Sequence, residues 1–228
     1  MLLTNRLYRN AAQLTQLVRA LISSACLANI AHQYYLFHQA SLGHWPAPGE
    51  GLASEQRADV LTGVQLLAAL LAFGALLTWM YRAYRNVHAL PGARPMHAAS
   101  VAIWGWLIPI INLWYPCRIM QEIGHYTVRY AHPNDTRLAS RWDYTVAAWW
   151  ILNIVSFVVT RLALYMDRSL GNSLTDSMQY DRLLLCGYII SIGASLLTFA
   201  LLRMLAPHEQ ALLREPNAPP VPLEPSIF

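Results

Sequence analysis

Long runs without a charged side chain constrain this chain more than any other feature. Val60–Met80 contains 21 such residues and Leu183–Leu202 contains 20. A helix of about 20 residues crosses about 30 Å of hydrocarbon, so each run has the length of a transmembrane helix. The composition agrees, because only 12% of the residues are charged, about half the share typical of soluble domains. The sequence therefore predicts an all-α integral membrane protein.

Two further apolar runs complete the predicted spans. Ala20–Phe37 has 18 residues without a charge if its histidine is neutral, and Tyr144–Thr160 has 17 and continues as an apolar stretch past Arg161. We therefore expect four transmembrane helices in a single membrane domain, residues 1–206. The expected spans cover about 17–37, 60–81, 144–166 and 183–204.

The segment at about 98–116 is also apolar, but Gly105, Pro109, Asn112 and Pro116 would interrupt a helix there. Arginines help to decide how it lies, because cytoplasmic loops are rich in basic residues. If the segment enters and leaves on one face, 12 arginines share that face and three lie opposite; if it spans, the count is eight against seven. We therefore expect a re-entrant or interfacial segment, both termini in the cytoplasm, and a location in the cell membrane. A kinked fifth span is the alternative.

Residues 117–130 carry the pattern of an amphipathic helix. Ile119, Ile123, Tyr126 and Tyr130 recur at intervals of three and four residues, with polar side chains on the other faces. Such a helix is expected to lie at the cytoplasmic membrane interface.

The C-terminal residues 207–228 are rich in proline and poor in large apolar side chains. Proline disfavours a continuous helix, and the segment has little surface to bury in a core. We therefore expect an extended, disordered tail, which is suited to recruiting a protein partner.

Three motifs occur in a fixed order along the chain. Trp79–Asn86 reads WMYRAYRN, Gly105–Ile123 reads GWLIPIINLWYPCRIMQEI, and Ala147–Phe157 reads AAWWILNIVSF. Together they resemble a bacterial multi-span membrane family known as domain of unknown function 4328, over roughly Val60–Met204. The resemblance implies a membrane location. It transfers no activity and no catalytic residue.

The first motif contains Arg82 and Arg85, which lie three residues apart and share one face of a helix. One interpretation is an arginine and tyrosine anchor at headgroup depth, including contact with anionic lipid headgroups. The other is that one arginine pairs with Glu122 or Asp143 and holds the NLWYP turn in place, or binds an anionic substrate.

Asn112 lies between two prolines and is a candidate for capping the backbone groups that they leave free, or for lining a solute site. Arg161 is a charged residue inside a predicted span, in the outer half of that span. It is expected to pair with an aspartate or to reach the surface, or else to belong to a permeation path. His32 lies at a similar depth and is suited to either network.

No catalytic motif is found, and the three cysteines do not have metal-ligand spacing, so we expect no enzyme activity, metal, cofactor or nucleic-acid partner. The favoured function is a non-enzymatic subunit or scaffold of a cell-envelope assembly, and a homo-oligomer is one form that it can take. The alternative is a small oligomeric channel or transporter that uses residues 105–116 in a solute path. A transporter needs polar groups that converge inside the membrane, whereas a scaffold can be packed solid.

Overall fold

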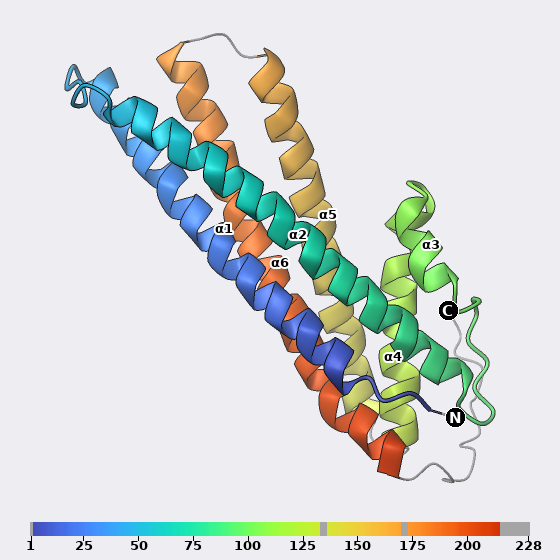
Figure 1. The fold of residues 1–228 in the computed structure, drawn as a ribbon. Coiled ribbons are helices and arrows are strands. Elements are labelled where there is room, and N and C mark those ends of the chain that lie inside the picture. Colours follow the sequence, from blue (N-terminus) through green and yellow to red (C-terminus); the bar gives the residue numbers. More distant parts are fainter. Residues whose placement is uncertain (1, 133–135, 170–172, 215–228) are drawn as a thin grey trace. The chain divides into compact units, whose positions relative to one another are not determined.

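The computed structural model describes residues 2–132, 136–169 and 173–214, and every regular element among these residues is helical. Figure 1 shows how they follow one another along the chain. The elements are α1 (Arg6–Ser41), α2 (Glu50–His88), α3 (Val101–Leu107), the 3-10 turn η1 (Ile111–Leu113), α4 (Tyr115–Ala131), α5 (Thr136–Ser169) and α6 (Leu174–Arg214).

Within the described residues, four helices are long and apolar enough to cross a membrane, as the sequence predicted. The span-forming stretches are Arg6–Ser41, Glu50–His88, Ser140–Ala163 and Leu174–Leu213. All four helices extend beyond the apolar runs, because flanking polar residues continue the same backbone hydrogen bonding outside the hydrocarbon. The predicted all-helical fold with four spans is confirmed.

The ambiguous segment at 98–116 does not form a long helix. α3 has seven residues, about 10 Å of rise, and is followed by η1 and α4. α3 packs against both η1 and α4, so the chain reverses within this segment (Figure 1). Pro116 stands in the first turn of α4, where its missing N–H costs no helical hydrogen bond. This is the compact broken segment that the sequence favoured over a fifth span.

The chain forms two compact units, and each long helix contributes residues to both. Unit 1 comprises residues 1–14, 73–150 and 198–228, as far as they are described, and contains α3, η1 and α4. Its core holds the largest buried side chains, and α4 directs Ile119 and Ile123 into it. These core residues include Trp79, Met80, Tyr84, Ile119, Met120, Ile123, Trp142, Trp149, Leu201, Leu202 and Leu205. The expected position of α4 at the cytoplasmic membrane interface stays a prediction.

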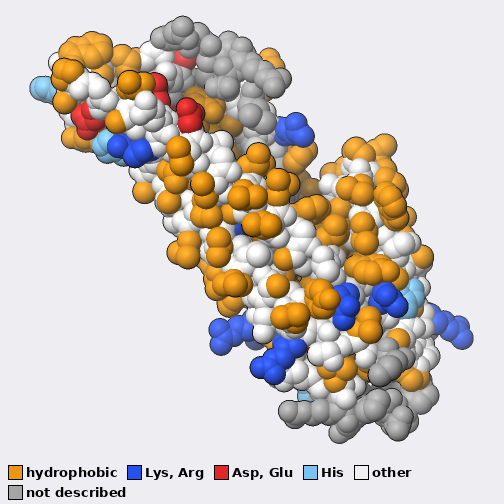
Figure 2. All heavy atoms as spheres, in the orientation of Figure 1, with side chains coloured by type: hydrophobic (Ala, Val, Ile, Leu, Met, Phe, Trp, Pro, Cys, Tyr) orange, Lys and Arg blue, Asp and Glu red, His pale blue; other side chains and the backbone are white. Residues whose placement is uncertain are grey.

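Unit 2 comprises residues 15–72 and 151–197. Its buried side chains are smaller and include a set of polar ones. The buried polar residues are Gln16, Ser23, Ser54, Asp181, Ser191 and Ser195. On the outside of α2, by contrast, large apolar side chains such as Leu66, Leu67, Leu70 and Leu71 are exposed (Figure 2). An exposed apolar helix face of this kind suits contact with lipid.

The last helix continues further than expected. α6 includes Pro207 and ends at Arg214, whereas the sequence placed the start of a disordered tail at residue 207. The turns after the proline are held because Glu209 is buried in unit 1 and Leu212 lines a cavity there. The rest of the expected tail, residues 215–228, lies outside the described residues.

Candidate functional site

The WMYRAYRN motif forms the last turns of α2 and divides its side chains between two faces. Trp79, Met80, Ala83 and Tyr84 are buried in the core of unit 1. This spacing of one, three and one residues places them on one side of a helix. The arginines and the asparagine of the motif are therefore directed elsewhere.

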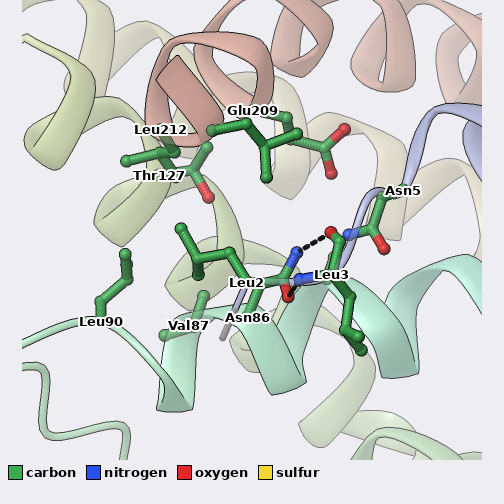
Figure 3. A pocket seen from close by; sticks show the side chains of 11 residues that line it. Leu2, Leu3, Asn5, Asn86, Val87, Leu90, Thr127, Glu209 and Leu212 are labelled. Atoms are coloured by element: carbon green, nitrogen blue, oxygen red, sulfur yellow. Dashed lines mark hydrogen bonds between the residues drawn. The ribbon is translucent and has the colours of Figure 1, made fainter. Parts of the chain in front are cut away.

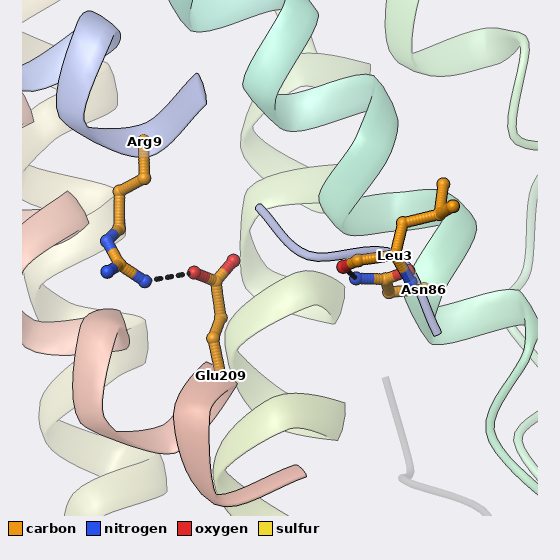
Figure 4. A network of polar contacts seen from close by, with 4 residues as sticks. All are labelled: Leu3, Arg9, Asn86 and Glu209. Carbon is orange, nitrogen blue, oxygen red and sulfur yellow. Dashed lines mark hydrogen bonds and ion pairs between the residues drawn. The ribbon is translucent and has the colours of Figure 1, made fainter. Parts of the chain in front are cut away.

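Asn86 binds the backbone of the N-terminal segment through both ends of its amide. The Leu3 N–H donates to Asn86 Oδ1 at 2.8 Å, and Asn86 Nδ2 donates to the Leu3 carbonyl at 2.7 Å (Figure 4). One turn earlier, Arg82 donates to the carbonyl of Thr4 at 3.3 Å, and its guanidinium lies 4.1 Å from the ring centre of Tyr8. The polar face of the motif thus holds residues that precede the first span.

A buried ion pair lies next to this contact. Arg9 Nη1 and Glu209 Oε2 are 2.5 Å apart, and their side chains are only 4% and 10% exposed (Figure 4). Asn5 and Trp79 are also buried in unit 1. Burying a single charge costs several kcal/mol, so the pair and its neighbours keep the ends of α1 and α6 in one arrangement within unit 1.

The N-terminal segment and Glu209 line a cavity of about 20 Å³ in unit 1. Figure 3 shows Leu2 and Leu3 beside Asn86 and Val87 of α2. Such a volume has room for about one water molecule. It is far below the several hundred Å³ typical of pockets for small-molecule ligands.

The second and third motifs meet in an aromatic cluster. The Trp106 ring lies 5.3 Å from Phe73, 6.5 Å from Trp149 and 5.7 Å from Trp150, in edge-to-face geometry. Such aromatic pairs contribute about 0.5–1.5 kcal/mol each beyond their buried area. Trp149 also donates from Nε1 to Thr198 Oγ1 of α6 at 2.9 Å. The cluster therefore joins α2, α3, α5 and α6 within unit 1.

Asn112 does not provide the expected side-chain cap for the broken segment. Its backbone N–H closes the turn on the Ile108 carbonyl at 2.8 Å, but its side-chain Oδ1 is buried without a hydrogen-bond partner. The carbonyl of Leu113 is instead satisfied by Trp150, whose Nε1 donates to it at 2.9 Å. An indole on the neighbouring span thus takes the role that the sequence assigned to the asparagine.

Glu122 is held by a tyrosine of the first motif. The Tyr84 hydroxyl donates to Glu122 Oε2 at 2.6 Å, and the Met96 N–H donates to the same oxygen at 3.3 Å. Tyr84 also accepts the His97 N–H at 3.3 Å. These bonds fasten the loop between α2 and α3 to α4. The link from the motif to Glu122 therefore runs through Tyr84.

The two motif arginines occupy different surroundings. Arg82 contacts the N-terminal segment, as described above, while Arg85 is exposed and lies 5.8 Å from the ring centre of Tyr81. The interfacial anchor that the sequence favoured for these arginines stays a prediction. Neither contact is the expected pairing of an arginine with Glu122.

Asp143 of α5 is half-buried and faces His125 and Cys117 of α4. Burial lowers the pKa of His125, and the charge of Asp143 acts in the opposite direction. For the Cys117 thiol, burial instead raises the pKa, because the charged form is the thiolate. The surroundings thus favour a neutral imidazole and a protonated thiol, with no activated nucleophile.

Arg161 and His32 both belong to unit 2 and lie on its surface. Arg161 is exposed, and its guanidinium is 5.1 Å from the ring centre of Phe157, one turn earlier on α5. His32 is exposed, and its Nε2 is 3.7 Å from Glu50 Oε1 at the start of α2. Neither side chain lines the interior, so neither position supports a permeation path.

Sequence reasoning missed the polar residues inside the units. Gln16, Arg19 and Ser23 share one face of α1, and their spacing of three and four residues was the available signal. The arginine counts given above include Arg19 as one of the 12 that share a face. The partnership of Arg9 with Glu209 joins positions 200 residues apart, and no local pattern indicates it.

The fold and this site define a helical, multi-span membrane protein without a substrate-sized cavity among the pockets described in unit 1. The chain belongs to the family described as a domain of unknown function (DUF4328), whose sequence model matches residues 47–206. Searches of curated proteins and of solved structures give no match. All three motifs fall inside the matched region, whereas Leu3, Arg9 and Glu209 fall outside it.

Proposed function

We propose that the protein is a non-enzymatic scaffold subunit of a membrane assembly in the cell envelope. The proposal rests on one observation: the tryptophans of the family motifs pack inside the protein. Trp106, Trp149 and Trp150 pack against one another inside unit 1, and Trp79 is fully buried there. The cavity in this unit holds about one water. Residues used in this way maintain a shape, and the cavity in unit 1 is too small for a substrate.

The broken segment supplies a surface that suits a partner. On α3 and the following turn, Trp104, Leu107, Ile110 and Trp114 are 57–76% exposed, and Figure 2 shows apolar side chains gathered over α3. Aromatic side chains concentrated on one surface are characteristic of protein interfaces. We propose that this surface contacts a transmembrane helix of another subunit. We also propose that both termini of this chain lie in the cytoplasm.

The alternative, a channel through residues 105–116, has less support. The exposed side chains of this segment are apolar, and its freed carbonyl at Leu113 is already bound by Trp150. A solute path requires polar groups that face a cavity. The exposed position of Arg161 adds no such group.

Site-specific photo-crosslinking in the native membrane tests the proposal. A photoreactive amino acid in place of Trp104 or Trp114 is expected to yield a discrete protein adduct. The matched control is Leu70, an exposed apolar residue on α2, where we expect adducts with lipid only. If positions 104 and 114 also give lipid adducts only, and the purified protein conducts solutes in proteoliposomes, the scaffold proposal is wrong.

A further inference from the structure

A chain of polar side chains crosses the interior of unit 2 and joins three spans. Gln65 Nε2 of α2 donates to Ser23 Oγ of α1 at 2.9 Å. Ser23 and Ser191 Oγ of α6 are 3.5 Å apart, and Arg19 Nη2 donates to the same Ser191 oxygen at 3.4 Å. Both serines are buried. The last two contacts are longer than an ordinary hydrogen bond.

On α6 the cluster lies well inside the uncharged run, whereas on α1 Arg19 directly precedes the run Ala20–Phe37. Ser191 is eight residues after the start and 11 before the end of the uncharged run Leu183–Leu202, so it is about 12 Å from the start of the run. Gln65 lies inside the uncharged run of α2. Arg19 is therefore level with the middle of α6, where an uncompensated charge is costly.

No carboxylate compensates Arg19 among the described residues. The ion pairs found there join Arg9 to Glu209 and His32 to Glu50. Asp181 is buried on α6, but it is ten residues before Ser191, about 15 Å along the helix. Arg19 Nε is buried and has no hydrogen-bond partner. The cluster thus carries one positive charge without a visible counter-charge.

The hydrogen-bond directions leave a further donor free. Ser23 Oγ already accepts a hydrogen from Gln65, and Ser191 Oγ accepts one from Arg19. Whichever serine donates to the other, one hydroxyl hydrogen remains without an acceptor in the cluster. The amide oxygens of Gln16 and Gln65 are also buried without partners. The free donors and the positive charge of Arg19 suit an anion. The nearby amide oxygens can accept hydrogen bonds from a water molecule that stays bound to this anion.

We propose that Arg19, Ser23 and Ser191 bind a small monovalent anion of the halide class inside unit 2. The anion supplies the charge that Arg19 lacks and accepts the free serine hydroxyl and the Arg19 Nε–H. Ser191 Oγ is 3.4 Å from Arg19 Nη2 and 3.5 Å from Ser23 Oγ, so a small ion can contact all three together. A lipid phosphate is held at the membrane surface and does not reach the depth of Ser191. This site is independent of the proposed scaffold surface.

Halide-dependent stability of the purified full-length protein tests the site. We expect chloride or bromide to raise the melting temperature relative to gluconate at equal ionic strength, because a ligand that binds the native state stabilises it. Arg19→Gln should abolish the shift, and Ser191→Ala should raise the apparent Kd for bromide at least about tenfold, the effect of losing about one charge-assisted hydrogen bond. The control Arg203→Gln, which removes an exposed arginine of α6, should keep the full shift.

The wild-type protein provides a second measurement if Arg19→Gln does not fold. Crystals grown in bromide should show an anomalous peak within contact distance of both Arg19 and Ser191. An absent peak, or no halide-dependent stabilisation of the wild type, would overturn the proposal. An equal halide response in wild type and Arg19→Gln would also overturn it, since the ion would then bind elsewhere.

Discussion

The indole of Trp142 lies directly against the backbone of Gly124. Trp142 is 2% exposed, and its Nε1 donates to the Met120 carbonyl of α4 at 3.1 Å. A Cβ atom at position 124 would come within 1.9 Å of the indole. The absence of a side chain at Gly124 is therefore what allows α4 and α5 to approach so closely within unit 1.

Replacing Gly124 with alanine should destabilise unit 1. The added methyl group has to displace a buried indole, and overpacking of this kind costs about 1–3 kcal/mol. Thermal unfolding in detergent should show a lower melting temperature. Gly74→Ala is the matched control, because Gly74 is also helical and a Cβ there meets nothing within 4 Å. A stability for Gly124→Ala equal to that of the control would contradict the close contact.

The buried pair of Arg9 and Glu209 should show strong coupling in a double-mutant cycle. Arg9→Met or Glu209→Met alone leaves one buried charge unpaired, which costs about 3–5 kcal/mol. The double variant removes both charges and should be more stable than the sum of the two single losses implies. Chemical unfolding of the four proteins measures the coupling. Additive losses would show that the two side chains do not act as a pair.

Asn86 should control the exposure of the N-terminal segment. Asn86→Leu removes both hydrogen bonds to Leu3, each contributing about 1 kcal/mol, so local opening becomes about tenfold or more frequent. Hydrogen exchange measured by mass spectrometry should show faster exchange in a peptide that contains Leu3. Arg85→Ala is the control, because Arg85 is adjacent and exposed. Unchanged exchange in Asn86→Leu would mean that other contacts hold the segment.

His125 should make stability depend on pH. Burial lowers its pKa, Arg129 adds to the lowering, and Asp143 and Glu122 oppose it. In the unfolded chain the pKa is about 6.5, so below that pH the unfolded chain binds more protons and stability falls until the pH passes the lower folded pKa. The melting temperature of His125→Gln should therefore drop less than that of wild type between about pH 7.5 and about pH 5.

His44→Gln is the control for this titration, because His44 lies in the exposed loop between α1 and α2. Its pH dependence should match that of wild type. If His125→Gln also matched wild type, burial of His125 would not contribute to the acid sensitivity.

The arrangement of the chain across the membrane can be tested with single cysteines in a background that lacks the three native ones. Reporters at Met96 and His132 flank α3, η1 and α4, and both should be labelled from the cytoplasm. Reporters at His44 and Ser173 should be labelled from the opposite side. All four positions are exposed. Labelling of Met96 and His132 from opposite faces would require a fifth crossing between them.

Local features of the sequence were sufficient for the fold class. Uncharged runs of 20 and 21 residues predicted spans, proline and glycine predicted the break near residue 109, and the periodicity of Ile119 and Ile123 predicted the amphipathic helix. The extent of α6 was not predictable in this way. The turns that follow Pro207 depend on the burial of Glu209 in unit 1, and no local propensity records that contact.

The sequence by itself determined which segments are apolar enough and long enough to cross a membrane, because length and hydropathy belong to each helix alone. Only the tertiary structure decided which residues of the chain contact one another. It placed Trp150 on the carbonyl of Leu113 and Arg82 on the N-terminal segment. It also brought Arg19 level with the middle of α6. These outcomes depend on the register in which one helix packs against another, and that register is set by contacts between residues far apart in the chain.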